Sequence, residues 1–200
     1  MAAWNELPAP WPDVFGLMWE AYAAGTVPVG AVVVDESGEI VSRGRNRIFD
    51  GSQDGHLGRS RLAHAEVNAL AALPSDRLYP DFTLYTSLEP CHLCLSAALT
   101  VQLGNLAYAA HDPYGGAVGK LVPSAAHEAH VQLEVVGPLD GAAGRLPEVL
   151  HLAHFLSRNS TAGVVGFYRR TRPELLAAAE KLPKPDAHAT LADAFAALDT

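Results

Sequence analysis

The sequence reads His-Ala-Glu at residues 64–66 and Pro-Cys-His-Leu-Cys at residues 90–94, and these two stretches decide the fold that we expect. His64, Cys91 and Cys94 supply one imidazole and two thiolates, ligands that Zn²⁺ prefers. Three protein ligands leave the fourth tetrahedral position open for a water molecule, as in catalytic zinc sites. Zinc lowers the pKa of such a water toward about 7, and we expect Glu66 to carry its proton.

A Cys-x-x-Cys pair has a second interpretation, because thioredoxin-like redox centres use the same spacing. However, Cys91 and Cys94 are the only cysteines of the chain, and Pro90 directly precedes them. The redox interpretation also leaves His64 and Glu66 without a role. His-x-Glu followed by Pro-Cys-x-x-Cys is the pattern of zinc-dependent deaminases. We therefore expect one zinc ion on His64, Cys91 and Cys94.

Length and composition set the class of protein. The chain has 200 residues, of which 49% are hydrophobic, so one domain can bury a full core without disulfides. No apolar run reaches about 18 residues, and residues 1–12 lack the pattern of a secretory signal. Two cysteines at ligand spacing indicate a reducing compartment. These features predict a cytoplasmic protein without a membrane span.

The charge balance bears on the substrate. Asp and Glu number 22 against 14 Lys and Arg, which gives a net charge of −8. Nucleic-acid-binding proteins usually carry a basic patch that displaces counterions from phosphates. An acidic chain therefore favours a small, diffusible substrate over a polynucleotide, although a local basic patch is compatible with it.

Residues 11–45 predict a helix followed by an antiparallel hairpin. Apolar residues recur at helical spacing in Trp11–Ala24, and Val27–Val34 is nearly all apolar, as in a strand buried on both faces. A short turn leads to a second strand at Glu39–Arg45. Gly30 lies inside the first strand, either as a floor for a flat substrate or where the sheet bulges or a helix packs closely.

A polar loop at residues 47–63 ends at the metal ligand His64, so we expect it to border the active site. Its side chains, among them His56, Arg59 and Arg61, also fit a solvated surface loop. The middle of the chain then predicts a strand–helix–strand unit with parallel strands, in which the helix dipole stabilises the cysteine thiolates. Its elements are a helix at His64–Leu73, a strand at Phe82–Thr86, a helix from Pro90 to Leu103 and a strand at Asn105–Ala110.

Residues 112–116 follow the carboxyl end of a strand, where α/β sheets bind ligands. Val131–Val136 predicts a last strand and Leu146–Arg158 an amphipathic helix. We expect no second metal site, because no cysteine or carboxylate completes a set with His127, His130, His151 and His154. The tail predicts two helices, Pro173–Leu182 and Thr190–Leu198, joined by a linker at Pro183–Pro185. These helices could pack on the core, cover a neighbouring subunit or lack order.

Longer segments around the two motifs carry a resemblance to a known family. PVGAVVVDESGEIVSRGRN (residues 28–46), HAE, TSLEPCHLC (86–94) and YAAHDPYGGAVGKL (108–121) resemble the cytidine deaminase-like superfamily. Within it, the pattern is most similar to the branch of tRNA adenosine deaminases, guanine deaminases and fungal-type cytosine deaminases. The resemblance covers about residues 14–158.

The resemblance implies a three-layer α/β/α fold with a five-stranded mixed sheet. We expect this deaminase domain at residues 11–158, followed by a helical C-terminal extension at residues 159–200. It implies that zinc-bound hydroxide attacks the amino-bearing ring carbon, while Glu66 passes a proton to a ring nitrogen and then to the leaving ammonia. It also implies a homodimer. The substrate would be bound by Asn46 and Asp112 and by the backbone around Ala65, Ser87 and Glu89.

Three functions remain open at this point. The acidic chain and the long loop at residues 47–63 favour a hydrolytic deaminase of a free nucleobase or nucleoside. The hairpin and the segment around Asp112 favour the alternative, a tRNA adenosine deaminase that forms inosine at the wobble position. A zinc-stabilised scaffold without catalysis is the third, and replacement of Glu66 would separate it from the others. The long loop and the tail depart from the family pattern, so the substrate does not follow from the resemblance.

Overall fold

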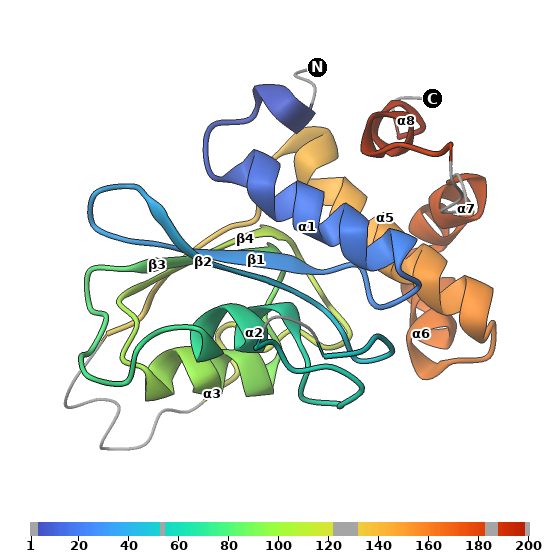
Figure 1. The fold of residues 1–200 in the computed structure, drawn as a ribbon. Coiled ribbons are helices and arrows are strands. Elements are labelled where there is room, and N and C mark those ends of the chain that lie inside the picture. The colour runs from blue at the N-terminus through green and yellow to red at the C-terminus, as the bar shows by residue number, and fades with distance from the viewer. Residues whose placement is uncertain (1–3, 53–54, 122–131, 183–187, 199–200) are drawn as a thin grey trace.

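The computed structural model describes residues 4–52, 55–121, 132–182 and 188–198. Its centre is a five-stranded mixed sheet in the order β2-β1-β3-β4-β5. Helices cover both faces of the sheet, so the predicted three-layer α/β/α architecture is confirmed (Figure 1). The strands are β1 (Gly30–Val34), β2 (Ile40–Arg45), β3 (Thr83–Leu88), β4 (Asn105–Ala110) and β5 (Glu134–Val136).

The strand pairing determines which strand ends meet on one side of the sheet. β1 pairs antiparallel with both β2 and β3, as the predicted hairpin requires for β2. β3, β4 and β5 run parallel, because α3 (His92–Thr100) crosses between β3 and β4 and returns the chain to the same edge. The carboxyl ends of β3 and β4 therefore lie beside the start of β1.

One face of the sheet is covered by α1 (Trp11–Ala23) and α5 (Gly141–Arg158). α1 buries Val14, Phe15 and Met18 in this layer. A Cβ atom on Gly30 would collide with the backbone of Val14 and Met18, so glycine lets α1 lie directly on β1. Of the two interpretations of Gly30, close helix packing is the one that the structure supports.

The opposite face carries α2 (Ala65–Ala71) and α3, which pack over the sheet with Leu70, Leu95 and Ala98. Gly44 has the same role here that Gly30 has on the other face, because a Cβ atom on Gly44 would collide with the backbone of α2. Two helices are thus held close to the hairpin from opposite sides. This close packing fixes the start of α2, which holds the first metal ligand.

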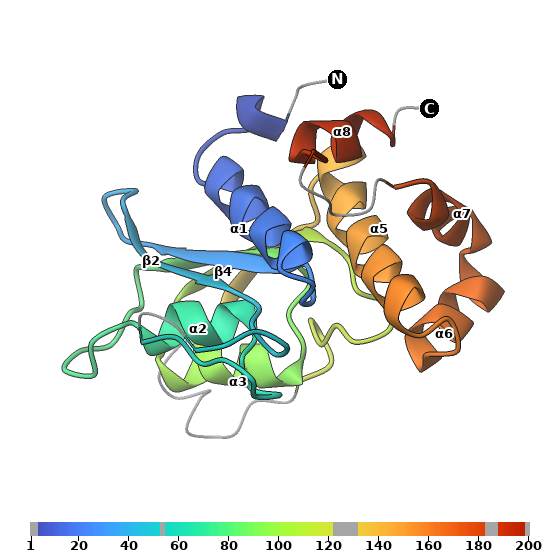
Figure 2. The same ribbon diagram turned by 45° about the vertical axis from the view of Figure 1, so that its right-hand side comes forward.

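The tail packs against the outer side of α5 and shares its core (Figure 2). Its helices are α6 (Gly163–Thr171), α7 (Pro173–Lys181) and α8 (Leu191–Ala196). α7 and α8 confirm the two predicted helices, but the pattern did not predict α6. Gly163 and Gly166 lower the helix propensity of that segment, and burial of Val164, Val165 and Tyr168 compensates for it. The linker at Pro183–Pro185 lies outside the described residues.

Two predicted elements differ in length. α5 begins at Gly141 and not at Leu146, because the small residues at its start conceal the apolar period. β5 begins at Glu134, and the predicted start at Val131 lies outside the described residues. In the described parts of the chain, no helix combines the length and apolar character needed to cross a bilayer.

Candidate active site

The three metal-ligand candidates come from the N-termini of two neighbouring helices. His64 is the N-cap of α2, Cys91 is the N-cap of α3, and Cys94 lies in the first turn of α3. α2 follows β2 through the loop at residues 47–63, and α3 follows β3, so both helix starts lie on the side of the sheet where these two strands have their carboxyl ends. Helix N-termini favour negative charge, so they stabilise thiolates at Cys91 and Cys94.

The distances between the candidate ligand atoms fit a tetrahedral zinc ion. His64 Nδ1 lies 3.4 Å from Cys94 Sγ and 3.7 Å from Cys91 Sγ, and the two sulfurs are 3.6 Å apart. Ligand atoms about 2.0–2.3 Å from a tetrahedral zinc are separated by about 3.5–3.8 Å. Among the described residues, these three form the one cluster of His, Cys, Asp and Glu that can hold a metal ion. The predicted zinc site is confirmed.

The two thiols have opposite acidities. Their mutual contact lowers the pKa of Cys91 to about 3, with a smaller contribution from His64, whereas burial raises it. The same contact, together with burial, raises the pKa of Cys94 well above its ordinary value. The pair therefore carries a thiolate on Cys91 at neutral pH, and binding of a metal releases the thiol proton of Cys94.

Glu66 lies in the first turn of α2 and is almost completely buried. Burial raises the pKa of its carboxyl group. The Thr86 hydroxyl of β3 donates a hydrogen bond of 3.2 Å to Glu66 Oε1, which orients the carboxyl group beside His64. A carboxyl group whose pKa is raised binds a proton more readily than an ordinary carboxylate and can afterwards return it.

A pocket of about 190 Å³ opens over these residues at the carboxyl edge of the sheet. It contains six of the nine predicted site residues, whereas Cys94, Ala65 and Ser87 are buried outside its lining. Ser87 Oγ accepts a hydrogen bond from Gly30 N and so joins β3 to β1. The lining residues are Val27, Val29, Asn46, Ile48, His64, Glu66, Leu88, Glu89, Cys91, Asp112, His151 and Phe155.

Asn46 follows β2 and lines the pocket. Its Oδ1 accepts hydrogen bonds from Thr26 Oγ1 at 2.8 Å and from Ile48 N at 3.1 Å. Asn46 Nδ2 makes no hydrogen bond with the described residues. The side chain is therefore fixed with a donor available to a bound molecule.

Glu89 and Asp112 line the pocket but also hold the loop that follows β4. Glu89 Oε1 accepts a hydrogen bond from Val118 N, and Glu89 Oε2 accepts one from Asp112 N, both at 3.2 Å. Asp112 Oδ1 accepts from Tyr114 N and Gly115 N. The two carboxylates thus fix the shape of one side of the pocket.

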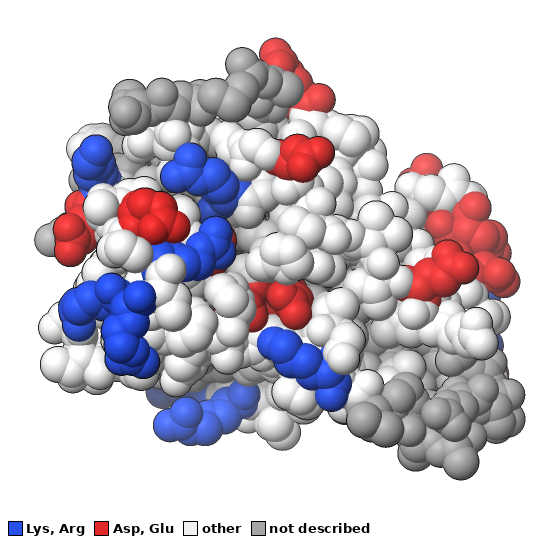
Figure 3. All heavy atoms as spheres, turned by 180° about the vertical axis from the view of Figure 1, so that it is seen from behind, with Lys and Arg blue, Asp and Glu red and all other residues white. Residues whose placement is uncertain are grey.

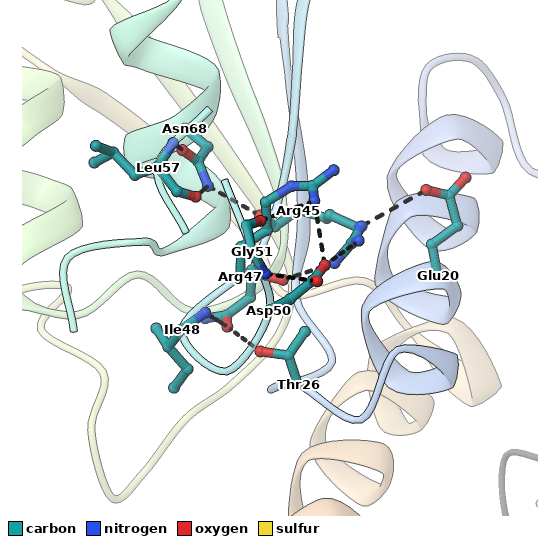
Figure 4. A network of polar contacts seen from close by, with 10 residues as sticks. Glu20, Thr26, Arg45, Arg47, Ile48, Asp50, Gly51, Leu57 and Asn68 are labelled. Carbon is teal, nitrogen blue, oxygen red and sulfur yellow. Dashed lines mark hydrogen bonds and ion pairs between the residues drawn. The ribbon is translucent and has the colours of Figure 1, made fainter. Parts of the chain in front are cut away.

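The loop at residues 47–63 is held by contacts of Asp50 near its start and of Leu57 farther along. Asp50 forms ion pairs with Arg45 at 2.5 Å and with Arg47 at 3.1 Å (Figure 4). Farther along, Leu57 N donates to Asn68 Oδ1 on α2 at 2.7 Å. Ile48 is the loop residue that lines the pocket, whereas His56, Arg59 and Arg61 are not among the lining residues.

Sequence reasoning missed six lining residues. Val27, Val29, Ile48 and Leu88 flank predicted positions, and their apolar character alone does not mark a pocket. His151 and Phe155, hereafter the α5 wall, lie one turn apart on α5. The signal for them was their spacing on one helix face, but the sequence does not reveal which way α5 turns that face.

Comparisons with known proteins agree with this geometry. Residues 13–110 match the family described as the cytidine and deoxycytidylate deaminase zinc-binding region. A tRNA-specific adenosine deaminase of Agrobacterium fabrum is 39% identical over 106 residues, which are 50% of this chain and 64% of that protein. A tRNA(Ile)-lysidine synthase of Deinococcus radiodurans is 40% identical over 110 residues, which are 54% of this chain and only 18% of that protein. The chain therefore matches only part of the length of each relative.

Two solved structures share the fold. One belongs to a study of A-to-I editing by tRNA:A34 deaminases at the wobble position, with 29% identity, a TM-score of 0.51, and coverage of 64% of this chain and 89% of that one. The other is a guanine deaminase from Nitrosomonas europaea, with 27% identity, a TM-score of 0.53, and coverage of 72% and 86%. The predicted resemblance to the cytidine deaminase-like superfamily is therefore confirmed: residues 13–110 match its zinc-binding region, the three candidate ligands are positioned to bind a metal ion, and the fold is shared with these solved structures.

Proposed function

We propose that the protein is a zinc-dependent hydrolytic deaminase whose substrate is adenosine in transfer RNA. The observation that carries the deaminase assignment is the position of buried Glu66 beside the ligand cluster of His64, Cys91 and Cys94, in one pocket. When bound there, zinc supplies an acidified water at neutral pH. The residues of the chain must then bind the ring and move protons.

Glu66 is the residue that moves the protons. Addition of water to a heterocycle places negative charge on a ring nitrogen, and the amine leaves readily only as ammonia. A single carboxyl group that takes a proton from the water can neutralise the ring nitrogen and then the amine. The hydrogen bond from Thr86 and the burial of Glu66 keep this group in place and out of bulk water.

The charges in the pocket select an uncharged ring. Three carboxylates line it, from Glu66, Glu89 and Asp112, and none of its described lining residues is Lys or Arg. A phosphate group inside this pocket would meet these carboxylates without a Lys or Arg side chain to offset them. A volume of about 190 Å³ is also below that of pockets for drug-sized ligands. The pocket suits a single base, including one flipped out of an RNA loop.

Support for transfer RNA comes from the names of the relatives and from the surface. Both sequence relatives described above have names that refer to tRNA. The net charge of −8 is unevenly distributed, since Lys and Arg side chains gather on the α6 and α7 side of the face in Figure 3. Arg169 and Arg170 in the last turn of α6 are exposed. Such a surface can bind phosphates outside the pocket.

The second candidate is deamination of a free nucleobase or nucleoside, which the acidic chain and the likeness to a guanine deaminase favour. A panel of adenine, guanine, cytosine, their nucleosides and monophosphates, and an anticodon stem-loop RNA would be assayed for ammonia release by zinc-loaded protein. We expect inosine in the RNA, with slow turnover of free adenosine. Fast turnover of one small compound with inert RNA would favour the second candidate. A homodimer and a cytoplasmic location stay predictions from the sequence.

A further inference from the structure

The pocket lining extends beyond the family match, with Asp112 just past its end and two residues much farther along the chain. His151 and Phe155 belong to α5, whereas the matched region ends at residue 110. The two side chains are four residues apart and therefore lie on the same face of the helix. The metal side of the pocket (His64, Glu66 and Cys91) and the α5 wall thus come from different parts of the chain.

His151 offers hydrogen-bonding groups to whatever enters the pocket. Its side chain is 9% exposed, and its ring lies edge-on to Phe155 with centroids 5.0 Å apart and an interplanar angle of 77°. Burial lowers the pKa of His151, and the Asp112 carboxylate opposes this shift more weakly. The imidazole is therefore neutral near pH 7, with one donor and one acceptor. Within the described residues, His151 makes no hydrogen bond.

The remaining lining divides into apolar and polar contributions that suit a flat ring. Val27, Val29 and Leu88 supply apolar contacts, and the Phe155 ring adds an aromatic surface. Asn46 Nδ2 supplies a fixed donor. Apart from the carboxylates and the metal ligands, His151 and Asn46 are the polar side chains among the described lining residues.

We propose that the α5 wall determines which base the pocket accepts, with His151 hydrogen-bonding to a polar group of the ring and Phe155 packing against the ring. This inference rests on the proposed function and deepens it, because it assigns the choice of base to residues that the family's zinc-binding region lacks. A base that cannot pair with His151 leaves a buried polar group unsatisfied, which disfavours its binding.

The chain provides a matched control. His154 is one turn from His151 on the same helix and is also buried, at 3% exposure, but it packs between Phe49 and Phe155 and does not line the pocket. The experiment compares His151→Leu, His151→Gln and His154→Leu. For each zinc-loaded variant, kcat and KM are measured on the base, nucleoside and stem-loop RNA panel, together with zinc content and melting temperature.

Loss of one hydrogen bond corresponds to about a tenfold change in affinity. We expect His151→Leu to raise KM for the preferred substrate about tenfold and to reduce its preference over the other bases by a similar factor. His151→Gln, which keeps a donor and an acceptor, should recover part of the preference. His154→Leu should leave kcat/KM within about twofold. The inference is overturned if His151→Leu keeps the preference, or if His154→Leu changes it equally.

A second measurement separates this inference from the proposed function. Zinc-loaded Glu66→Gln protein, with and without His151→Leu, is titrated with the same bases and with the stem-loop RNA by calorimetry. If no panel member is deaminated by the wild-type protein, the proposed function fails, and the difference in binding still decides the role of His151. Weaker binding of one base in the His151→Leu protein supports the inference, and equal binding of every ligand refutes it.

Discussion

The metal side of the pocket and the α5 wall are specified in different ways. The metal side is local: His64 and Glu66 are two residues apart, Cys91 and Cys94 are three apart, and each pair occupies the start of one helix. The α5 wall reaches the pocket because α5 packs on the sheet beside α1 and against the tail helices. The comparison suggests that the catalytic chemistry depends on short motifs, whereas substrate choice depends on long-range packing.

The largest effect should follow from breaking the metal side. Cys91→Ala or Cys94→Ala should lose zinc, abolish turnover and lower the melting temperature, because metal binding is coupled to folding. His64→Ala should behave in the same way. His92→Ala is the matched control, since His92 lies between the two cysteines but is exposed and outside the ligand cluster. Metal analysis and thermal melts test this, and unchanged zinc in both cysteine variants would refute the assignment.

The next effect should be confined to chemistry. Glu66→Gln keeps the shape of the side chain but cannot accept a proton, so we expect kcat to fall by about 10²–10⁴-fold while zinc remains bound. Glu66→Ala should likewise abolish measurable turnover and keep zinc. Single-turnover assays with metal analysis measure both properties. Full activity in zinc-loaded Glu66→Gln protein would favour a different proton carrier, and absence of activity in the wild type would favour the scaffold hypothesis.

A smaller effect should follow from loosening the support behind the α5 wall. Glu148 of α5 is buried and accepts hydrogen bonds at 2.7 Å from Tyr168 OH and from Arg172 Nη1. Burial raises the pKa of this carboxyl group. Removal of the Arg172 guanidinium, its cationic partner, should therefore lower the stability of the fold. We expect Arg172→Ala to reduce the free energy of unfolding by about 1–3 kcal/mol. The effect is smaller than for a fully buried pair, because the Arg172 side chain is partly exposed while Glu148 is buried.

Exposed Arg170 is the matched control for this pair. Arg170→Ala should change the free energy of unfolding by less than about 0.5 kcal/mol. Urea denaturation of both variants measures the difference. Equal stability of the two variants would show that the contact between Arg172 and Glu148 does not secure the tail to α5.

Sequence predicted the metal side well because its information is short-range. Two motifs and the order of strands and helices placed His64, Glu66, Cys91 and Cys94 correctly relative to one another. The sequence marks His151 only as a possible metal ligand, because an amphipathic pattern does not indicate which neighbouring element the polar residues of the helix face. α6 was missed because two glycines conceal a helix that tertiary contacts stabilise. Both failures concern residues whose conformation depends on packing across the core.

The smallest effect concerns the pH dependence of the α5 region. Burial lowers the pKa of His154 to about 4, with further contributions from His151 and Arg158. The unfolded chain binds a proton at an ordinary pKa of about 6.5, so His154 stabilises the fold fully above that pH and loses this contribution as the pH falls toward 4.

His154→Leu should therefore reduce the loss of stability on acidification. Between pH 7 and pH 4.5, we expect the variant to lose about 1–3 kcal/mol less unfolding free energy than the wild type, as measured by urea denaturation at both values. Zinc release on acidification affects both proteins, so the difference between them isolates His154. His151 is buried in both proteins, and burial lowers its pKa. An identical loss in both proteins would mean that His154 titrates normally in the fold, so that α5 packs less tightly against Phe49 than the structure shows.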